Sequence, residues 1–288
     1  MGGDTMDKFL LPVDDDLPMN NWGQWTEIKL FYLERYINIF ETSMKDKWST
    51  RNYIDLLAGS GKNTINNSKV ILGSPLIALT TPYPFTHYYF VDIDKKNINS
   101  LITRCNHSQY NINVNIYWED CNIIVDQIIN SIKSSNVNSL NLAFLDPRGL
   151  ELQWNTIKKL ASTPKMDLII YYPQMGLTRY IKTAYQSDAP TSVDNFFGTD
   201  EWRNIYQQCQ NRSILNAELI NLYRKQLQNI GYKYIFQGNE DLQSSPLITN
   251  TKRNPLYRLI FASKHTLGHD FWKKAILKDP YGQRHFDL

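Results

Sequence analysis

Five short apolar runs, separated by stretches with helix signals, constrain the fold of this chain more than any other feature. Each run has five to seven residues, the length of a buried strand, and most of the segments between them can hold a crossover helix. Strands that alternate with helices in this way are typical of βαβ units in a mostly parallel sheet. The five runs are 53–58 (YIDLLA), 87–93 (HYYFVDI), 114–118 (VNIYW), 140–145 (LNLAFL) and 167–172 (DLIIYY).

Helices are expected around these strands. Residues 22–43 place apolar side chains at largely helical spacing, which predicts an amphipathic helix over one face of the sheet. Ser74 is expected to cap a helix that begins at Pro75. The pattern weakens over 174–212, with one short helix, and this segment is interpreted as a candidate lid or substrate insertion. Further helices are predicted at about 95–105, 123–133, 214–230 and 268–277, the third ending at Gly231.

Two more β-rich runs lie near the C-terminus, at 232–237 (YKYIFQ) and 257–263 (YRLIFAS). No helix separates them, so they are expected to pair antiparallel. The predicted fold class is therefore α/β, with a seven-stranded mostly parallel sheet, a C-terminal antiparallel hairpin and helices on both faces. This strand inventory resembles the Rossmann-like class I methyltransferase fold. We expect residues 1–21 to form an extension and residues 22–288 to form one domain.

Composition and charge narrow the function classes. No apolar run approaches the roughly 20 residues that cross a bilayer, and no signal-peptide pattern appears, so a cytoplasmic protein is expected. Cys105, Cys121 and Cys209 are too few and too widely spaced for a disulfide framework or a four-ligand zinc site, so no metal is expected. The net charge of +3 gives no strong footprint for nucleic acid. Only 252–288 has a local excess of basic residues, which fits either a phosphate-facing patch or a solvated surface.

The loop AGSGKN, after the first strand, is the first candidate binding site. In an open parallel sheet, ligands bind outside the carboxyl ends of the strands, and this loop is normally part of the crevice. Gly59 and Gly61 let the backbone approach a ligand and adopt positive φ angles. With Asp55 in the preceding strand, we predict that Asp55, Ala58, Gly59, Ser60 and Gly61 bind a cofactor. A simple tight turn is the alternative.

Acidic residues lie at the end of the second strand and just after the third. Asp92, with Ile93 beside it, can accept hydrogen bonds from both ribose hydroxyls of an adenosine-type ligand. Asp94 is a rival for that role, but its position before a helix favours capping. Asp120 and Cys121 fall where such folds contact the adenine amino group, for which a carboxylate is a suitable acceptor. A solvated turn explains them equally well.

The fourth strand ends in Asp146-Pro147-Arg148-Gly149, beside the expected position of the cofactor's methyl group. Asp146 is a candidate to orient an acceptor or take its proton. Pro147 ends the strand, and Arg148 is a candidate to hold a phosphate or carboxylate. A D-P-x-G sequence is also a good turn former, so catalysis and a plain turn both remain open.

The sequence contains YIDLLAGSGKN, AFLDPRGLELQW and DLIIYYP, which together with four further segments resemble the three-Cys-motif partner (TcmP) proteins, a bacterial family with a methyltransferase-like fold. The resemblance implies an S-adenosylmethionine pocket and association with a radical-S-adenosylmethionine-like three-Cys-motif protein, to which the cysteines of the name belong. This chain departs from common methyltransferases in an extra polar segment, 62–72, and matches only half of the D-P-P-Y motif of amino-methylating enzymes. The matching segments are YIDLLAGSGKN, GSPLIAL, FVDID, AFLDPRGLELQW, DLIIYYP, FFGTDEW and YRLIFASKHTLGHDFWKKAILKDPYGQ.

The leading functional expectation is an S-adenosylmethionine-dependent methyltransferase that acts on nucleic acid or a nucleotide-like substrate. One alternative is a non-catalytic partner that keeps the fold and supports a radical enzyme, or reads nucleic acid through the basic C-terminal region. Nucleotide hydrolysis is disfavoured, because the Gly61-Lys62 pair lacks the upstream glycine of a P-loop and Asn63 replaces its metal-binding hydroxyl.

Overall fold

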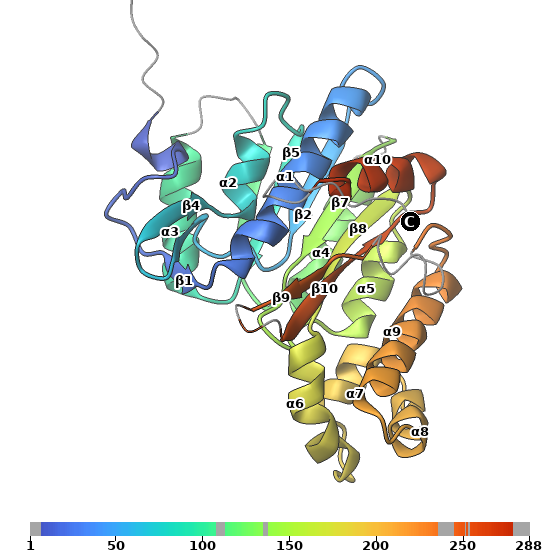
Figure 1. The fold of residues 1–288 in the computed structure, drawn as a ribbon. Helices are drawn as coiled ribbons and strands as arrows, with labels where there is room; N and C mark the ends of the chain where they lie inside the picture. The colour runs from blue at the N-terminus through green and yellow to red at the C-terminus, as the bar shows by residue number, and fades with distance from the viewer. Residues whose placement is uncertain are drawn as a thin grey trace, which may run out of the picture.

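A seven-stranded sheet lies at the centre of the computed structural model, which describes residues 7–107, 113–134, 138–235, 245–250, 252 and 254–278 (Figure 1). Its strand order is β6-β5-β2-β7-β8-β10-β9. All strands run in one direction except β10, which lies antiparallel between β8 and β9. The strands are β2 Arg51–Asp55, β5 His87–Asp92, β6 Asn113–Trp118, β7 Leu140–Leu145, β8 Met166–Tyr172, β9 Leu247–Thr249 and β10 Pro255–Ala262.

The C-terminal hairpin is present, but its first strand differs from the prediction. β9 pairs with β10, whereas within the predicted strand 232–237 only Tyr234 makes an isolated bridge, to Ser263. Residues 236 and 237 lie outside the described part of the chain. Tyr232 and Ile235 are buried, so the apolar residues of this run pack into the core without a long ladder of hydrogen bonds.

Helices cover both faces of the sheet (Figure 1). The five long predicted helices are confirmed to within a few residues, whereas α5 was not predicted. Gly73, not Ser74, is the N-cap of α2. One face carries α1 Trp25–Met44, α2 Ser74–Leu79, α3 Lys95–Asn106 and α10 Thr266–Ile276, and the other carries α4 Cys121–Ser134, α5 Trp154–Ala161 and α9 Arg212–Asn229.

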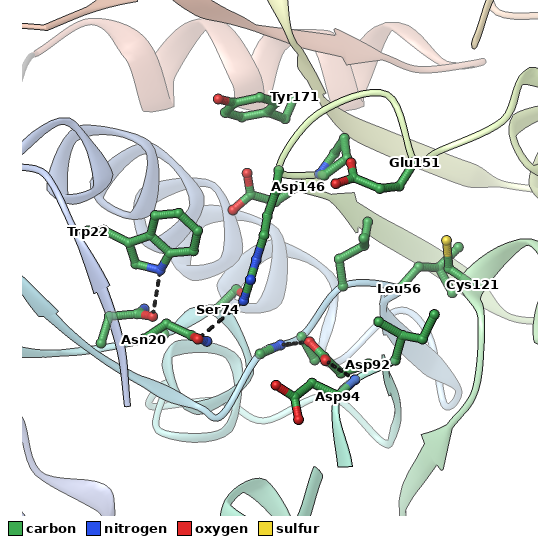
Figure 2. Close-up of a pocket in the computed structure, with 18 of the residues that line it drawn as sticks. Asn20, Trp22, Leu56, Ser74, Asp92, Asp94, Cys121, Asp146, Glu151 and Tyr171 are labelled. Carbon is green, nitrogen blue, oxygen red and sulfur yellow. Dashed lines mark hydrogen bonds between the residues drawn. The ribbon is translucent and has the colours of Figure 1, made fainter. Parts of the chain in front are cut away.

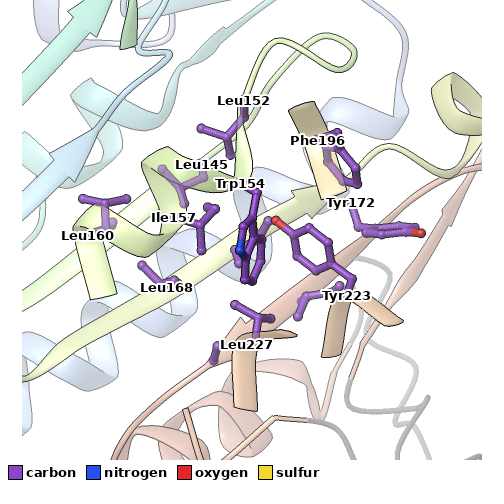
Figure 3. Close-up of a cluster of buried hydrophobic side chains, with 14 of the residues drawn as sticks. Leu145, Leu152, Trp154, Ile157, Leu160, Leu168, Tyr172, Phe196, Tyr223 and Leu227 are labelled. Atoms are coloured by element: carbon purple, nitrogen blue, oxygen red, sulfur yellow. The ribbon is translucent and has the colours of Figure 1, made fainter. Parts of the chain in front are cut away.

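The segment 174–212 forms three helices where one was expected: α6 Gln174–Tyr185, α7 Ser192–Phe197 and α8 Glu201–Gln208. Figure 3 shows part of the buried hydrophobic cluster that joins this segment to α5 and α9. The Phe196 ring stacks on Tyr223 with centroids 5.1 Å apart, and Tyr223 meets Trp154 edge to face at 5.2 Å. Gly198 ends α7 with φ +64°, and a Cβ there would lie 2.5 Å from the Trp154 ring.

A second, three-stranded sheet follows the glycine loop and was not predicted. Its strands are β1 Asn20–Trp22, β3 Lys62–Ile65 and β4 Lys69–Leu72. The extra polar segment 62–72 is therefore a hairpin, turned by Asn66 and Asn67 in the left-handed region that asparagine tolerates. The N-terminal segment adds β1 to this hairpin in parallel, so residues before the first helix reach the glycine loop.

A buried ionic cluster fastens residues 7–22 to the rest of the domain. The Asp15 carboxylate accepts hydrogen bonds from Arg104 Nε and Nη2 at 2.9 and 2.7 Å, and it pairs with Lys62 Nζ at 2.8 Å. All three side chains are fully buried. Lys62 also donates to two backbone carbonyls of the N-terminal segment. From residue 7 onward, the expected extension 1–21 thus packs on the domain.

Candidate functional site

A pocket of about 370 Å³ opens at the carboxyl ends of β2, β5, β6 and β7. The strand order reverses between β2 and β7, which is where open α/β sheets bind ligands. Its volume falls within the range of small-molecule sites, roughly 300–1,000 Å³. Figure 2 shows the side chains around it, with the opposite wall supplied by β1 and the first turns of α1.

The structure brings most of the predicted site residues together at this pocket. Asp55, Ser60 and Gly61 do not line it. The predicted residues that do are Ala58, Gly59, Asp92, Ile93, Asp120, Cys121, Asp146, Pro147 and Arg148.

Ser60 and Gly61 shape the loop from behind the pocket. The Ser60 hydroxyl donates to the carbonyl of Lys62 at 2.8 Å. Gly61 has φ +89°, and a Cβ there would lie 3.0 Å from the Leu101 side chain. Its carbonyl accepts a hydrogen bond from the Gly73 amide at 2.7 Å, which joins the two ends of the β3-β4 hairpin. Both residues thus hold the turn in which Gly59 faces the pocket.

Asp55 lies fully buried at the end of β2. Burial raises the pKa of its carboxyl to about 7, opposed by hydrogen bonds from Ser74 and the Leu57 amide and reinforced by the charges of Asp146 and Asp92. Its Oδ2 has no hydrogen-bond partner among the described residues. Near neutral pH this side chain is therefore partly a neutral acid beneath the pocket floor.

Asp92 organises the end of β5. Its Oδ2 accepts the Gly59 amide at 2.9 Å, and its Oδ1 accepts the Asp94 amide at 2.8 Å and Asn97 Nδ2 at 3.1 Å. A carboxylate has about four acceptor sites, so about one remains for a ligand hydroxyl. The Asp94 side chain caps α3 by accepting the Lys96 amide at 2.8 Å, which confirms the capping interpretation.

Asp120 and Cys121 meet the pocket at the start of α4. Asp120 Oδ1 accepts both the amide and the Nδ2 of Asn122, at 2.7 and 2.9 Å, and the neighbouring Cys121 thiol also hydrogen-bonds to this carboxylate. Burial raises the pKa of the Cys121 thiol to about 12. A thiol that stays protonated at neutral pH is a poor nucleophile, so Cys121 provides an apolar contact.

The loop after β7 reaches across to the N-terminal wall. Asp146 pairs through Oδ2 with Lys29 of α1, and both side chains are largely buried. Arg148 Nη2 donates to Asn20 Oδ1 at 3.2 Å, and its guanidinium lies 5.1 Å from the centroid of the Trp22 ring. Asp146 and Arg148 are thus held by the two elements that precede the first strand of the large sheet.

The sequence pattern does not predict this N-terminal wall. Trp25 and Lys29 line the pocket from one face of α1, since residues four apart are neighbours on a helix surface. A lysine on a face predicted to cover the sheet was an available signal. No sequence pattern indicates that Asn20 and Trp22 lie at the pocket, because their position depends on the pairing of β1 with β3. Tyr171, near the end of β8, also lines the pocket.

Carboxylates outnumber cations around the pocket. The cations that line it are Lys29 and Arg148, and the acidic residues that line it are Asp92, Asp94, Glu119, Asp120, Asp146 and Glu151. This excess of negative charge favours a cationic ligand and disfavours a polyphosphate.

The structure argues further against a phosphate-binding loop. The Lys62 ammonium is fully buried against Asp15, so it does not reach the pocket. No group of three or more His, Cys, Asp or Glu side chains in the described part of the chain is placed to hold a metal ion. Among the same residues, no helix has both the length and the apolar character to span a membrane.

Within the described residues of the basic C-terminal region, two basic side chains hydrogen-bond to backbone carbonyls and others are exposed. Burial lowers the pKa of Arg258, which donates to the Ser245 carbonyl at 3.1 Å. Lys264 donates to the Ala161 carbonyl at 2.5 Å. Lys273 and Lys274 are exposed on α10. Arg253 and Arg284, the other arginines of this region, lie outside the described residues.

The strand order, with only β10 reversed, defines this chain as a class I methyltransferase-like fold. Protein LPL1258 of Legionella pneumophila, classed under the family model DUF519, is similar over 88% of this chain and 90% of its own, at TM-score 0.50 and 10% identity. At this identity the likeness shows the fold alone.

Two further solved structures are more distant. A putative O-methyltransferase from Klebsiella pneumoniae is 7% identical, covers 81% of this chain and 80% of its own, and has a TM-score of 0.40. The plantazolicin methyltransferase BpumL, in complex with SAH, is 12% identical and has a TM-score of 0.38. The similarity covers 83% of this chain and 86% of BpumL. No family model matches the sequence. No curated protein matches it either.

Proposed function

We propose that this chain is an S-adenosylmethionine-dependent methyltransferase that acts on nucleic acid or a nucleotide-like substrate. One observation carries the proposal. The carboxylate at the end of β5, Asp92, is tied to the amide of Gly59 in the loop after β2, and both line a pocket at the reversal of strand order. In this arrangement the Asp92 carboxylate can accept a hydrogen bond from a ribose hydroxyl, and the ligand can approach the backbone of Gly59 closely because glycine has no side chain.

The residues present fit the cofactor. Asp92 has about one acceptor site left for a ribose hydroxyl, and the Asp120 carboxylate has about one left for the adenine amino group. Ile93, 70% exposed and lining the pocket, offers an apolar surface to the adenine ring. The acidic excess around the pocket favours the sulfonium cation. When bound, S-adenosylmethionine supplies an activated methyl group.

Asp146 is the candidate to orient the methyl acceptor. Its Oδ2 pairs with Lys29, and Oδ1 has no hydrogen bond to any described residue. That oxygen is available to accept a hydrogen bond from an N–H or O–H group of the acceptor, and then its proton. Lys29 acts through Asp146 and is a positioning residue.

A radical-S-adenosylmethionine-like three-Cys-motif protein is the proposed partner, supported by the resemblance of segments spread over most of the sequence. Co-expression of the two proteins followed by size-exclusion chromatography tests this association. For nucleic acid, the matching test is binding at several salt concentrations, because contacts to phosphates weaken as salt rises. Separate elution of the two proteins would contradict the proposed association. Binding of nucleic acid that does not change with salt would contradict contacts to its phosphates.

Calorimetry with S-adenosylmethionine tests the central proposal. The wild type is expected to bind and Asp92→Ala to lose most of its affinity. Asp94→Ala removes the α3 cap and one pocket carboxylate but leaves the contact between Asp92 and Gly59, so it is expected to keep most of its affinity. Absence of binding to the wild type refutes the proposal. If Asp94→Ala loses affinity and Asp92→Ala keeps it, the ribose contact belongs to Asp94. Mass spectrometry of ligands released from the purified protein is an independent check, with S-adenosylmethionine or S-adenosylhomocysteine expected.

A further inference from the structure

We infer that the half of the pocket between β1, α1 and the loop after β7 binds a flat ring joined to an anionic oxygen group, which is the chemistry of a nucleoside monophosphate. We call this the acceptor half and define it by Trp22, Trp25, Lys29, Asp146, Arg148 and Tyr171. The inference rests on the proposed methyl transfer and narrows its substrate class from nucleic acid in general to one nucleotide unit.

Aromatic rings line the acceptor half and are held in place from behind. Tyr171 packs against Tyr257 with ring centroids 3.9 Å apart, and the Tyr257 hydroxyl donates to the Trp25 carbonyl at 3.1 Å. The Trp25 ring lies so close to Gly23 that a Cβ there would come within 2.0 Å of it. With Trp22 on the same wall, these preformed apolar surfaces suit a flat ring.

Arg148 offers a donor fork to an anion. A guanidinium has five N–H donors, and in the described part of the chain only its bond to Asn20 engages one of them. Its side chain is exposed at the pocket rim and lies over Trp22, which orients the fork. A planar fork of this kind binds the oxygens of a phosphate or carboxylate in pairs.

Charge is distributed unevenly between the two halves of the pocket. In the acceptor half and its rim, Lys29 and Arg148 balance Asp146 and Glu151. At the ends of β5 and β6, all the charged residues that line the pocket are acidic, namely Asp92, Asp94, Glu119 and Asp120. An anionic group is therefore repelled from the cofactor side and is directed to Arg148.

Asp146 favours a substrate whose ring carries a hydrogen-bond donor. Its oxygen that is not bound to Lys29 has no hydrogen bond within the described residues, so it favours a ring that carries an N–H group. A nucleobase with an exocyclic amine meets this requirement, and its phosphate supplies the group for Arg148. A simple aromatic acid supplies the anion without the donor.

Calorimetry on protein saturated with S-adenosylhomocysteine tests the inference, because the cofactor half is then filled. The four common ribonucleosides, their 5′-monophosphates and benzoate are titrated separately. We expect at least one monophosphate to bind about tenfold more tightly than its nucleoside, as charge-assisted hydrogen bonds imply. Arg148→Met is expected to abolish this preference. Arg179→Met, a change at an exposed arginine of α6 outside the pocket, is expected to retain it.

The outcomes separate this inference from the function on which it rests. Circular dichroism of each variant verifies the fold, and Arg148→Lys, which keeps the charge but not the fork, is expected to retain part of the preference. If S-adenosylhomocysteine does not bind, the proposed function and the inference both fail. If it binds while nucleoside and monophosphate bind equally, or while Arg148→Met keeps the preference, only the inference fails. Benzoate binding as tightly as the best nucleotide would reassign the site to aromatic acids.

Discussion

Replacing Asp15 with asparagine is expected to destabilise the protein by about 3–5 kcal/mol, the usual effect of removing one partner from a buried ion pair. The change leaves Arg104 and Lys62, both fully buried, without a compensating charge. A domain is typically stable by only about 5–15 kcal/mol, so the loss is a large fraction of the total. It also loosens the segment that leads to Asn20 and Trp22, so S-adenosylmethionine binding is expected to weaken as well.

The pH dependence of stability gives a second measure of this cluster. Burial alone would raise the pKa of Asp15, but hydrogen bonds from Arg104 and Lys62 outweigh it and lower the pKa from 3.8 to about 2. This difference corresponds to about 2 kcal/mol of stability. Because the folded pKa is lowered, that stability is present above pH 4 and is lost as the pH falls from about 4 to 2. The loss is expected in the wild type and not in Asp15→Asn.

Urea denaturation followed by tryptophan fluorescence measures both effects. Asp16→Asn is the matched control, because the neighbouring carboxylate is 89% exposed and its pair with Lys8 lies at the surface. A surface pair contributes at most about 1 kcal/mol. Equal, small losses in the two variants would refute the assignment of Asp15 as the residue that holds the N-terminal segment.

Three further predictions follow from burial and backbone geometry. Burial raises the pKa of Asp55 to about 7, so the folded state binds a proton that the unfolded state releases, and wild-type stability should fall between about pH 4 and 7. Denaturation at pH 5 and 8 should show a smaller slope in Asp55→Asn, with the remainder due to the buried Glu41 and Asp167, whose pKa values are also raised by burial; an unchanged slope would count against it. Because burial raises the pKa of Cys121 to about 12, Ellman's reagent at pH 8 should label Cys209 before Cys121, and the opposite order would contradict its burial. Gly198→Ala should lower the melting temperature more than Gly231→Ala. Both glycines have positive φ, but only at position 198 would the new Cβ meet a tryptophan ring, at 2.5 Å. Equal shifts would exclude that clash as the cause.

The sequence by itself determined the five parallel strands, the long helices and the edge of the sheet where the site lies. These features are local: the length of the apolar runs, the proline after β7 and the glycines after β2 act within a few residues. Because the carboxyl ends of parallel strands share one edge, Gly59, Asp92, Asp120 and Asp146 could be placed near one another without coordinates.

Tertiary structure alone decided the wall opposite the sheet and the direction of the charged side chains. Lys29 meets Asp146 across 117 residues and Asp15 meets Arg104 across 89, and neither pairing leaves a periodic trace in the sequence. The sequence likewise shows a lysine after the glycine loop, but only the N-terminal segment, folded over β3, directs it away from the pocket. Strand and helix positions follow from short-range preferences, whereas the partner of a charge depends on which distant segments the whole fold brings together.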